Sequence, residues 1–204
     1  ALAGMPKQKT SSLLTKALAG KDAAIHLGAV TFLRTSNDKK TIVAVAKKLS
    51  SYTAAVQVSV INAICQTKEK AALSYIKKLD AKPNSQVGIA VLKAIGQLGG
   101  KSEVAYLTAM IPSSAANVKQ AISGSLVQLD SAGVDNALIK KLSKSDGEVR
   151  GMLIGVVSAR GVSAASEKLI LIARNDQKNR QAAVRALAGV AGVDALSVEL
   201  RGDL

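Results

Sequence analysis

Few side chains in this 204-residue chain could do chemistry. There is one histidine, His26, and one cysteine, Cys65. A Ser-His-Asp relay or a zinc site built on paired histidines would have to rest on His26 alone. Cys65 follows Ile64 with no second cysteine or obvious base nearby, so a small buried apolar residue is favoured over a nucleophile. The sequence therefore predicts that the protein is not an enzyme and needs no cofactor or metal.

Nucleotide-binding loops and base-stacking surfaces are also poorly represented. The segment Gly96-x-x-Gly99-Gly100 ends a predicted helix and follows no strand, unlike a phosphate-binding loop. Aromatic residues make up only 2% of the chain, whereas proteins that bind single strands stack bases on aromatic rings. Tyr75 and Tyr106 occupy the same slot of the repeat described below. Partly buried packing is their favoured role, and a binding pair is the alternative.

The charge is strongly asymmetric along the chain. The formal net charge is +14; residues 1–102 hold 16 Lys/Arg and 4 Asp/Glu, whereas residues 103–204 hold 12 and 10. One interpretation is a surface in the N-terminal half that binds nucleic acid or an acidic partner. The other is helix-dipole complementation, since acidic residues gather at predicted helix starts and basic residues at helix ends. The second explains the positions but not the excess.

The positions of these residues depend on a 31-residue repeat. Apolar residues recur at this step in four columns, which predicts helical hairpins that share one core. The column on the first helix of each hairpin is Leu14, Val45, Ile76, Leu107, Leu138, Leu169 and Leu200. The columns on the second helix are Ile25, Val56, Val87, Val118 and Val149; Ala29, Val60, Val91, Ile122 and Leu153; and Leu33, Ile64, Ile95, Leu126 and Val157.

The register predicts an all-α fold of about six hairpins in one array over residues 1–204. Polar turns separate the paired helices, and Ser145 or Asp146 is expected to cap the helix that follows. Near the C-terminus the step slips to 30, which puts Asn179 where a core valine is expected. The expected hairpins are 10–35, 39–66, 70–98, 101–129, 133–160 and 163–191, with partial repeats at 1–4 and 193–204.

The first four residues, with Leu2 in register, match the end of a helix. We therefore expect the chain to be a fragment of a longer repeat protein, which leaves its compartment, cytoplasmic or exported, open. The longest uncharged stretch, residues 49–67, is too polar for a membrane span.

Two segments resemble HEAT repeats. Ile139-Lys-Lys-Leu with Asp146-Gly-Glu-Val-Arg150 has the Leu-rich helix, the Asp-containing turn and the Val-Arg pair of that family, and Arg180-Gln-Ala-Ala-Val-Arg-Ala-Leu-Ala-Gly resembles its second half. The likeness is to short bacterial HEAT-like, armadillo-type repeats. It implies a right-handed α-solenoid whose second helices line the concave side. The period is shorter than the ~40–47 residues usual for such units, and the ~34-residue tetratricopeptide is the structural rival.

A solenoid of this kind implies binding or scaffolding more often than catalysis. We therefore expect a non-catalytic module that binds a protein partner or neighbouring domains of its parent chain. Binding of nucleic acid or an acidic partner through the basic N-terminal half is one alternative, and an accessory array of an exported carbohydrate-active protein is another. The candidate binding residues on the expected concave face are Lys93, Lys119, Arg150, Arg180 and Arg185.

Overall fold

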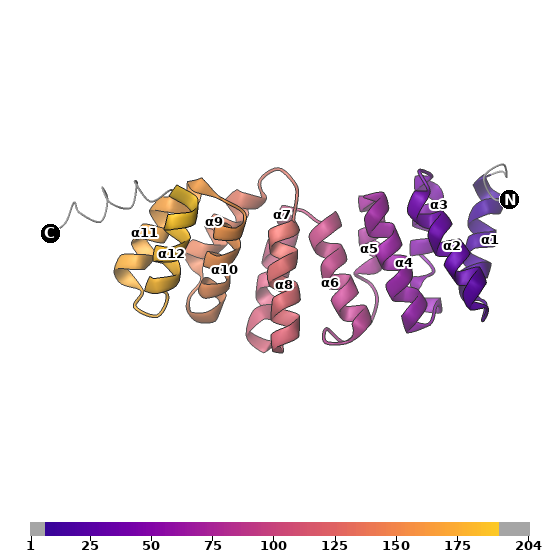
Figure 1. Cartoon of the computed structure of the whole chain (residues 1–204), viewed down its shortest axis with the longest axis horizontal. Coiled ribbons are helices and arrows are strands. Elements are labelled where there is room, and N and C mark those ends of the chain that lie inside the picture. The colour runs from indigo at the N-terminus through magenta and orange to yellow at the C-terminus, as the bar shows by residue number, and fades with distance from the viewer. Residues whose placement is uncertain (1–6, 192–204) are drawn as a thin grey trace. The chain divides into compact units, whose positions relative to one another are not determined.

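The computed structural model describes residues 7–191, and every regular element in that range is helical (Figure 1). Within these residues there are twelve α-helices, four short 3-10 helices and no β-strand. The all-α prediction is confirmed. The partial repeats expected at 1–4 and 193–204, with Leu2 and Leu200, lie outside the described range. The chain divides into two compact units, unit 1 (residues 1–99) and unit 2 (residues 100–204), so its assignment to one array stays a prediction.

Unit 1 lays its second helices side by side. Helix α2 packs against α4, and α4 against α6, as Figure 1 shows. Helix α1 packs against both α2 and α3, and α5 packs against α6. The elements are α1 (Lys7–Ala19), α2 (Ala23–Thr35), α3 (Lys39–Ala46), η1 (Leu49–Ser51), α4 (Ala54–Thr67), η2 (Lys70–Ala72), α5 (Leu73–Ile76) and α6 (Gln86–Leu98).

Unit 2 follows the same plan. Helix α8 packs against α10, and α10 against α12, while α7 packs against α9 and α9 against α11. The hairpin partners α9 and α10, and α11 and α12, also pack on each other. The elements are α7 (Lys101–Met110), η3 (Ile111–Ser113), α8 (Ala116–Gln128), α9 (Val134–Lys144), α10 (Gly147–Ala159), η4 (Ser163–Ala165), α11 (Ser166–Asn175) and α12 (Arg180–Ala191).

The 31-residue columns form the core of both units. Six of the seven first-helix residues fall in the described range, and all six are at most 1% exposed. Every member of the column from Leu33 to Val157 is fully buried. Burying a side chain of this size stabilises the fold by about 1.5–3 kcal/mol. The repeat therefore reports a shared interior, as the spacing predicts.

Three column members are less buried than predicted. Ile25 is 53% exposed, because among the described residues no earlier second helix precedes α2 to cover it. Val91 is half-buried, since its neighbour Leu92 takes the inward position on α6. Val149 is also half-buried. Helix α10 begins at Gly147 with φ +47°, a left-handed entry that turns its first residues differently from those of the other second helices.

The first helices of three expected hairpins, 39–66, 70–98 and 101–129, are not single continuous α-helices, since 3-10 turns interrupt or follow them. In the last of these, Pro112 has no N–H to donate, so α7 ends at Met110 and the chain tightens into η3. The prediction that the side chain of Ser145 or Asp146 caps α10 is also wrong. Ser145 Oγ donates to the carbonyl of Lys141, and Asp146 accepts no capping bond.

Candidate protein-binding groove

The five predicted binding residues all lie on second helices, but they differ in what they contact. Lys93 on α6 and Arg185 on α12 are exposed. Lys119 Nζ lies 2.6 Å from Glu148 Oε1, and Arg150 Nη1 lies 2.6 Å from Asp176 Oδ2. Arg180 donates to the carbonyls of Ala173 and Arg174 at the end of α11. Three of the five predicted residues therefore tie elements of unit 2 together.

Several of the residues that directly follow the column Ile25, Val56, Val87, Val118 and Val149 in the sequence make contacts of this kind. We call this repeat position the slot after the first apolar column. In unit 1, His26 Nε2 lies 3.0 Å from the Gly20 carbonyl oxygen, and Gln57 Nε2 donates to the Leu49 carbonyl oxygen at 3.0 Å. Because a carbonyl can only accept, the Nε2 of His26 carries the proton. His26 links α2 back to Gly20, just after α1 ends, and Gln57 links α4 back to Leu49, the first residue of η1, which is a structural role.

Arg160, at the end of α10, is a polar residue that sequence reasoning missed. Its guanidinium donates to the carbonyls of Val127 and Leu129 at 2.6 and 2.7 Å, where α8 ends. The same group pairs with Asp135 in the first turn of α9 at 2.8 Å. No residue one period away shares its type, so the repeat held no signal for this contact. Arg160 therefore fastens the end of α8 to two neighbouring helices.

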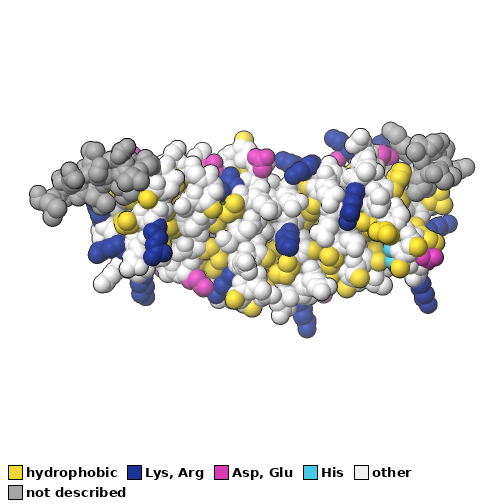
Figure 2. All heavy atoms as spheres, in the orientation of Figure 1, with side chains coloured by type: hydrophobic (Ala, Val, Ile, Leu, Met, Phe, Trp, Pro, Cys, Tyr) yellow, Lys and Arg dark blue, Asp and Glu magenta, His cyan; other side chains and the backbone are white. Residues whose placement is uncertain are grey.

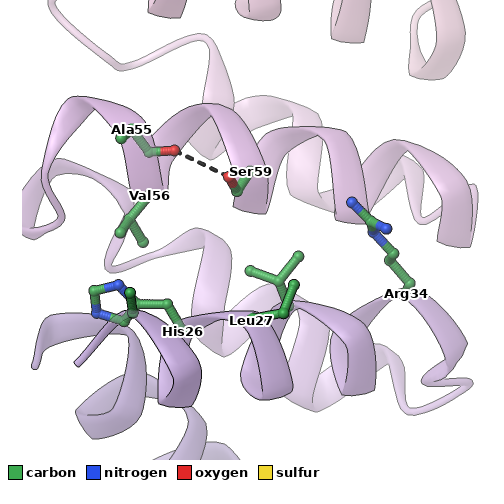
Figure 3. Close-up of a pocket in the computed structure, with 8 residues that line it drawn as sticks. His26, Leu27, Arg34, Ala55, Val56 and Ser59 are labelled. Carbon is green, nitrogen blue, oxygen red and sulfur yellow. Dashed lines mark hydrogen bonds between the residues drawn. The ribbon is translucent and has the colours of Figure 1, made fainter.

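A groove of about 280 Å³ runs between α2 and α4 in unit 1 (Figure 3). Its floor includes Val30 and Val56, which are 5% and 6% exposed, while Leu27 on its wall is 68% exposed. This volume lies at the lower limit of small-molecule pockets, about 300 Å³, and is enough to hold one or two side chains of a partner. The full lining is Ala23, His26, Leu27, Val30, Arg34, Ala55, Val56 and Ser59.

Polar groups stand at both ends of this groove. Figure 3 shows His26 close to Val56, and Leu27 and Arg34 reaching from α2 toward α4. His26 is bonded to Gly20, whereas exposed Arg34 forms no hydrogen bond or ion pair with any described residue. In Figure 2 hydrophobic side chains gather beside the chain's one histidine. The groove therefore combines an apolar wall with one uncommitted guanidinium.

A second groove of about 280 Å³ lies in unit 2, beside α9, α10 and α11. It also has an exposed leucine, Leu171, and an arginine, Arg150. Here the arginine is paired with Asp176, which also accepts from the side chain of Asn179 at 2.8 Å. The hydrogen bonds from Asn179 and Arg150 lower the pKa of Asp176 from 3.8 to about 2. Asn179 is buried as the register predicts, and this network satisfies it.

The basic excess lies in unit 1, which holds 15 Lys/Arg and 4 Asp/Glu, a net charge of +11; unit 2 holds 13 and 10, a net charge of +3. In unit 1 three acids cap helices: Asp22 accepts from the amides of Ala24 and Ile25, Asp38 from that of Lys40, and Glu69 from that of Ala71. Most of the carboxylates that could neutralise its lysines are therefore engaged by backbone.

Tyr75 lies between two of these lysines. Lys47 Nζ and Lys78 Nζ are each 5.6 Å from the centre of its ring. Tyr75 is half-buried, as predicted, but Tyr106 is 44% exposed and so is less packed than expected. Cation–π contacts of this kind orient lysine side chains, so the Tyr75 ring orients both Lys47 and Lys78 on the surface of unit 1.

Cys65, the one candidate nucleophile considered from the sequence, is buried. It is 5% exposed, and burial raises the pKa of its thiol to about 11, which makes the thiolate scarce at neutral pH. No group of three or more His, Cys, Asp or Glu in the described residues could hold a metal ion. Across the same range, no helix has the length and apolar character needed to cross a membrane.

Neither a scan against models of known protein families nor a search of curated proteins finds a match to this chain. The resemblance to HEAT repeats therefore rests on the residues quoted for it.

Proposed function

We propose that the chain is a non-catalytic α-solenoid module of HEAT-like hairpins that binds a protein partner. The all-helical fold and the buried 31-residue columns support the repeat assignment. In repeat proteins each unit packs on its neighbours, which leaves long surfaces for partners. A compact globule of this length would have a radius of gyration of about 17 Å. Small-angle scattering should give a clearly larger value, and a value close to that of the globule would remove the solenoid.

The single observation that carries the binding role is the groove between α2 and α4. A leucine that is 68% exposed beside a floor of buried valines is an anchor point for an apolar side chain. A single exposed apolar residue is normal on a protein surface, so the significance of Leu27 comes from the groove beside it. The groove is therefore the part of unit 1 best suited to seat a partner.

A peptide-display selection on the immobilised chain tests this role. Peptides enriched on the parent protein should lose binding to the Leu27→Ser variant and keep it on Leu13→Ser. Leu13 is the matched control because it is 43% exposed on α1 and lies outside the groove. Enriched peptides that bind both variants equally would place the binding surface elsewhere.

A second candidate function is binding of a nucleic-acid duplex through unit 1. The net charge of +11 and the two lysines held at Tyr75 favour it. Phosphate contacts make such binding steeply salt-dependent. Fluorescence anisotropy with labelled duplex DNA should then show binding at about 50 mM salt that falls sharply at about 200 mM and on Lys47→Glu with Lys78→Glu. Absence of binding at low salt would reject it.

A further inference from the structure

Building on the proposed protein-binding role, we infer that the groove between α2 and α4 takes a partner segment that carries, on one face, an apolar side chain and a carboxylate about 10–13 Å apart. The apolar side chain packs on Leu27, Val30 and Val56. The carboxylate pairs with Arg34. The partner is thus an acidic, amphipathic protein segment.

The apolar end of the site is set by Leu27. Its side chain is 68% exposed, while Val30 and Val56 beneath it are nearly closed to solvent. A partner side chain that packs there removes exposed apolar surface from water without displacing any hydrogen bond of the floor. Phosphates would gain nothing from these three residues, so the groove favours a protein segment over a nucleic acid.

The charged end of the site is Arg34, in the last turn of α2. An arginine at this position also complements the helix dipole, but two other arginines show what a committed guanidinium does in this protein. Arg160 and Arg180 donate to carbonyls where α8 and α11 end. Arg34 makes no such bond with the described residues and instead borders the groove. Its planar fork is therefore free to bind a carboxylate in two-point fashion.

The positive charge of unit 1 around the groove favours a partner segment of negative charge. Unit 1 has a net charge of +11, and three of its four acids accept backbone hydrogen bonds as caps. Among the described residues, no acidic side chain lines the groove. A basic segment would be repelled by this field, whereas an acidic one is drawn to it.

The spacing of the two ends fixes the pattern in the partner. Leu27 and Arg34 are seven positions apart on α2, which corresponds to about 10.5 Å along the helix. An α-helical partner matches this with an apolar residue and an acid at i and i+7. In an extended partner only residues an even number of positions apart share a face, so the nearest match is i and i+4, about 13 Å.

The test uses fluorescein-labelled peptides of four to five helical turns and the full chain. The first peptide places Leu and Glu at i and i+7 on a helix-forming Ala/Gln background, and the second places them at i and i+4 on a Ser/Thr background. Each has a version with Lys for Glu and one with Ser for Leu. In anisotropy titrations at low salt, at least one Leu–Glu peptide should bind about tenfold more tightly than both of its altered versions.

Substitutions in the protein test the charged end and the apolar end of the site separately. Arg34→Glu should weaken the Leu–Glu peptide at least about tenfold and make the Leu–Lys version the better ligand. Leu27→Ser should weaken the binding of both the Leu–Glu peptide and its Leu–Lys version. Lys40→Glu and Leu13→Ser are the matched controls and should bind like the parent, since both residues are exposed in unit 1 and lie outside the groove. Circular dichroism verifies that each variant is folded. A reversed preference on Arg34→Glu requires a direct charge contact, which a merely structural role would not produce.

The other outcomes separate this inference from the proposed function. If Leu27→Ser abolishes binding while Arg34→Glu and the Lys-bearing peptides change nothing, the groove binds protein but the carboxylate contact is wrong. If no peptide binds, or all variants bind alike, both the contact and the groove are rejected. If duplex DNA displaces the peptides and binds more tightly in an Arg34-dependent manner, the occupant is nucleic acid and the inference fails.

Discussion

The grooves of unit 1 and unit 2 are equal in volume but differ in how their arginines are engaged. Each is about 280 Å³ and has an exposed leucine and an arginine in its lining. In unit 2 the arginine is held by Asp176 at 2.6 Å, whereas in unit 1 Arg34 has no partner among the described residues. Equal size therefore does not imply equal function. The uncommitted guanidinium makes the unit 1 groove the candidate binding site.

This contrast extends to how each unit uses its acids. In unit 1 Asp22, Asp38 and Glu69 cap helix starts, while in unit 2 Asp135, Glu148 and Asp176 each pair with a basic side chain. The caps of unit 1 satisfy backbone amides at helix starts. Two of the ion pairs of unit 2, Lys119–Glu148 and Arg150–Asp176, join neighbouring hairpins, and Arg160–Asp135 lies within one. These three acids of unit 2 thus hold side chains of other elements, whereas the three acids of unit 1 hold backbone amides.

The largest expected effect tests what the two units share. Val60 in unit 1 and Leu153 in unit 2 occupy the same column and are both 0% exposed. Replacing either with Asp buries an unpaired charge and should lower the free energy of unfolding by about 4 kcal/mol. Val91→Asp, at the half-buried position of that column, should cost markedly less. Urea denaturation followed by circular dichroism measures all three, and equal losses at Val91 and Val60 would show that the column is misassigned.

The next largest loss of stability distinguishes an arginine that donates hydrogen bonds to backbone carbonyls from one that does not. Arg160→Met leaves the carbonyls that end α8 without their charged donor and should cost about 2 kcal/mol. The matched change in unit 1, Arg34→Met, should alter stability by no more than about 0.5 kcal/mol. The same urea titrations measure both. A loss at Arg34 as large as that at Arg160 would end the contrast between the units.

A smaller effect is expected at a buried polar atom that has no hydrogen-bond partner. Among the described residues each unit has one such side-chain atom, Tyr52 Oη in unit 1 and Arg150 Nε in unit 2. Tyr52→Phe removes the unsatisfied hydroxyl and should raise stability by about 1 kcal/mol. Burial raises the pKa of Tyr52 from 10.0 to about 12. Since the unfolded tyrosine ionises first, the parent should lose stability between pH 10 and 12, and that loss should be smaller in the variant. Thermal melts from pH 8 to 12 measure the difference.

The smallest effect has the most specific pH signature. Asp176 has a pKa of about 2 in the folded protein, against an ordinary value of 3.8. A lowered folded pKa stabilises the fold above the ordinary value, and that contribution fades as the pH falls toward 2. Asp176→Asn should therefore lower the melting temperature at pH 6, with a difference from the parent that shrinks below pH 4. A difference independent of pH would mean that the carboxylate charge is not the cause.

Much of the fold was open to prediction from periodicity, and the core columns show why. Leu33, Ile64 and Ile95 recur at a fixed step because each must face the same interior, and burial is what periodicity reports. The second helices consequently end within about one residue of the expected hairpin ends, a usual margin for helix ends. The 3-10 turns after α3 and α7 were missed because hydrophobic spacing does not distinguish 3-10 from α geometry over so few residues.

The candidate site was less open to prediction. Lys119 and Arg150 are on second helices as expected, but their partners Glu148 and Asp176 lie 29 and 26 residues ahead, nearly one repeat away. A search for opposite charges at that separation would have found them. Nothing comparable marks Arg34, because an unpaired side chain leaves no second residue in the sequence. Its significance depends on the groove that α2 and α4 form together.

Gly88 limits how far these hairpins can be interchanged. It occupies the slot filled by His26, Gln57, Lys119 and Arg150 in other hairpins, yet here a Cβ would overlap the carbonyl oxygen of Lys82 and lie 2.8 Å from Pro83. A consensus protein that averages the hairpins would place a long side chain at this slot throughout. It would force the loop of residues 77–85 off α6. Engineering with this scaffold must therefore keep this hairpin distinct or redesign its connecting loop.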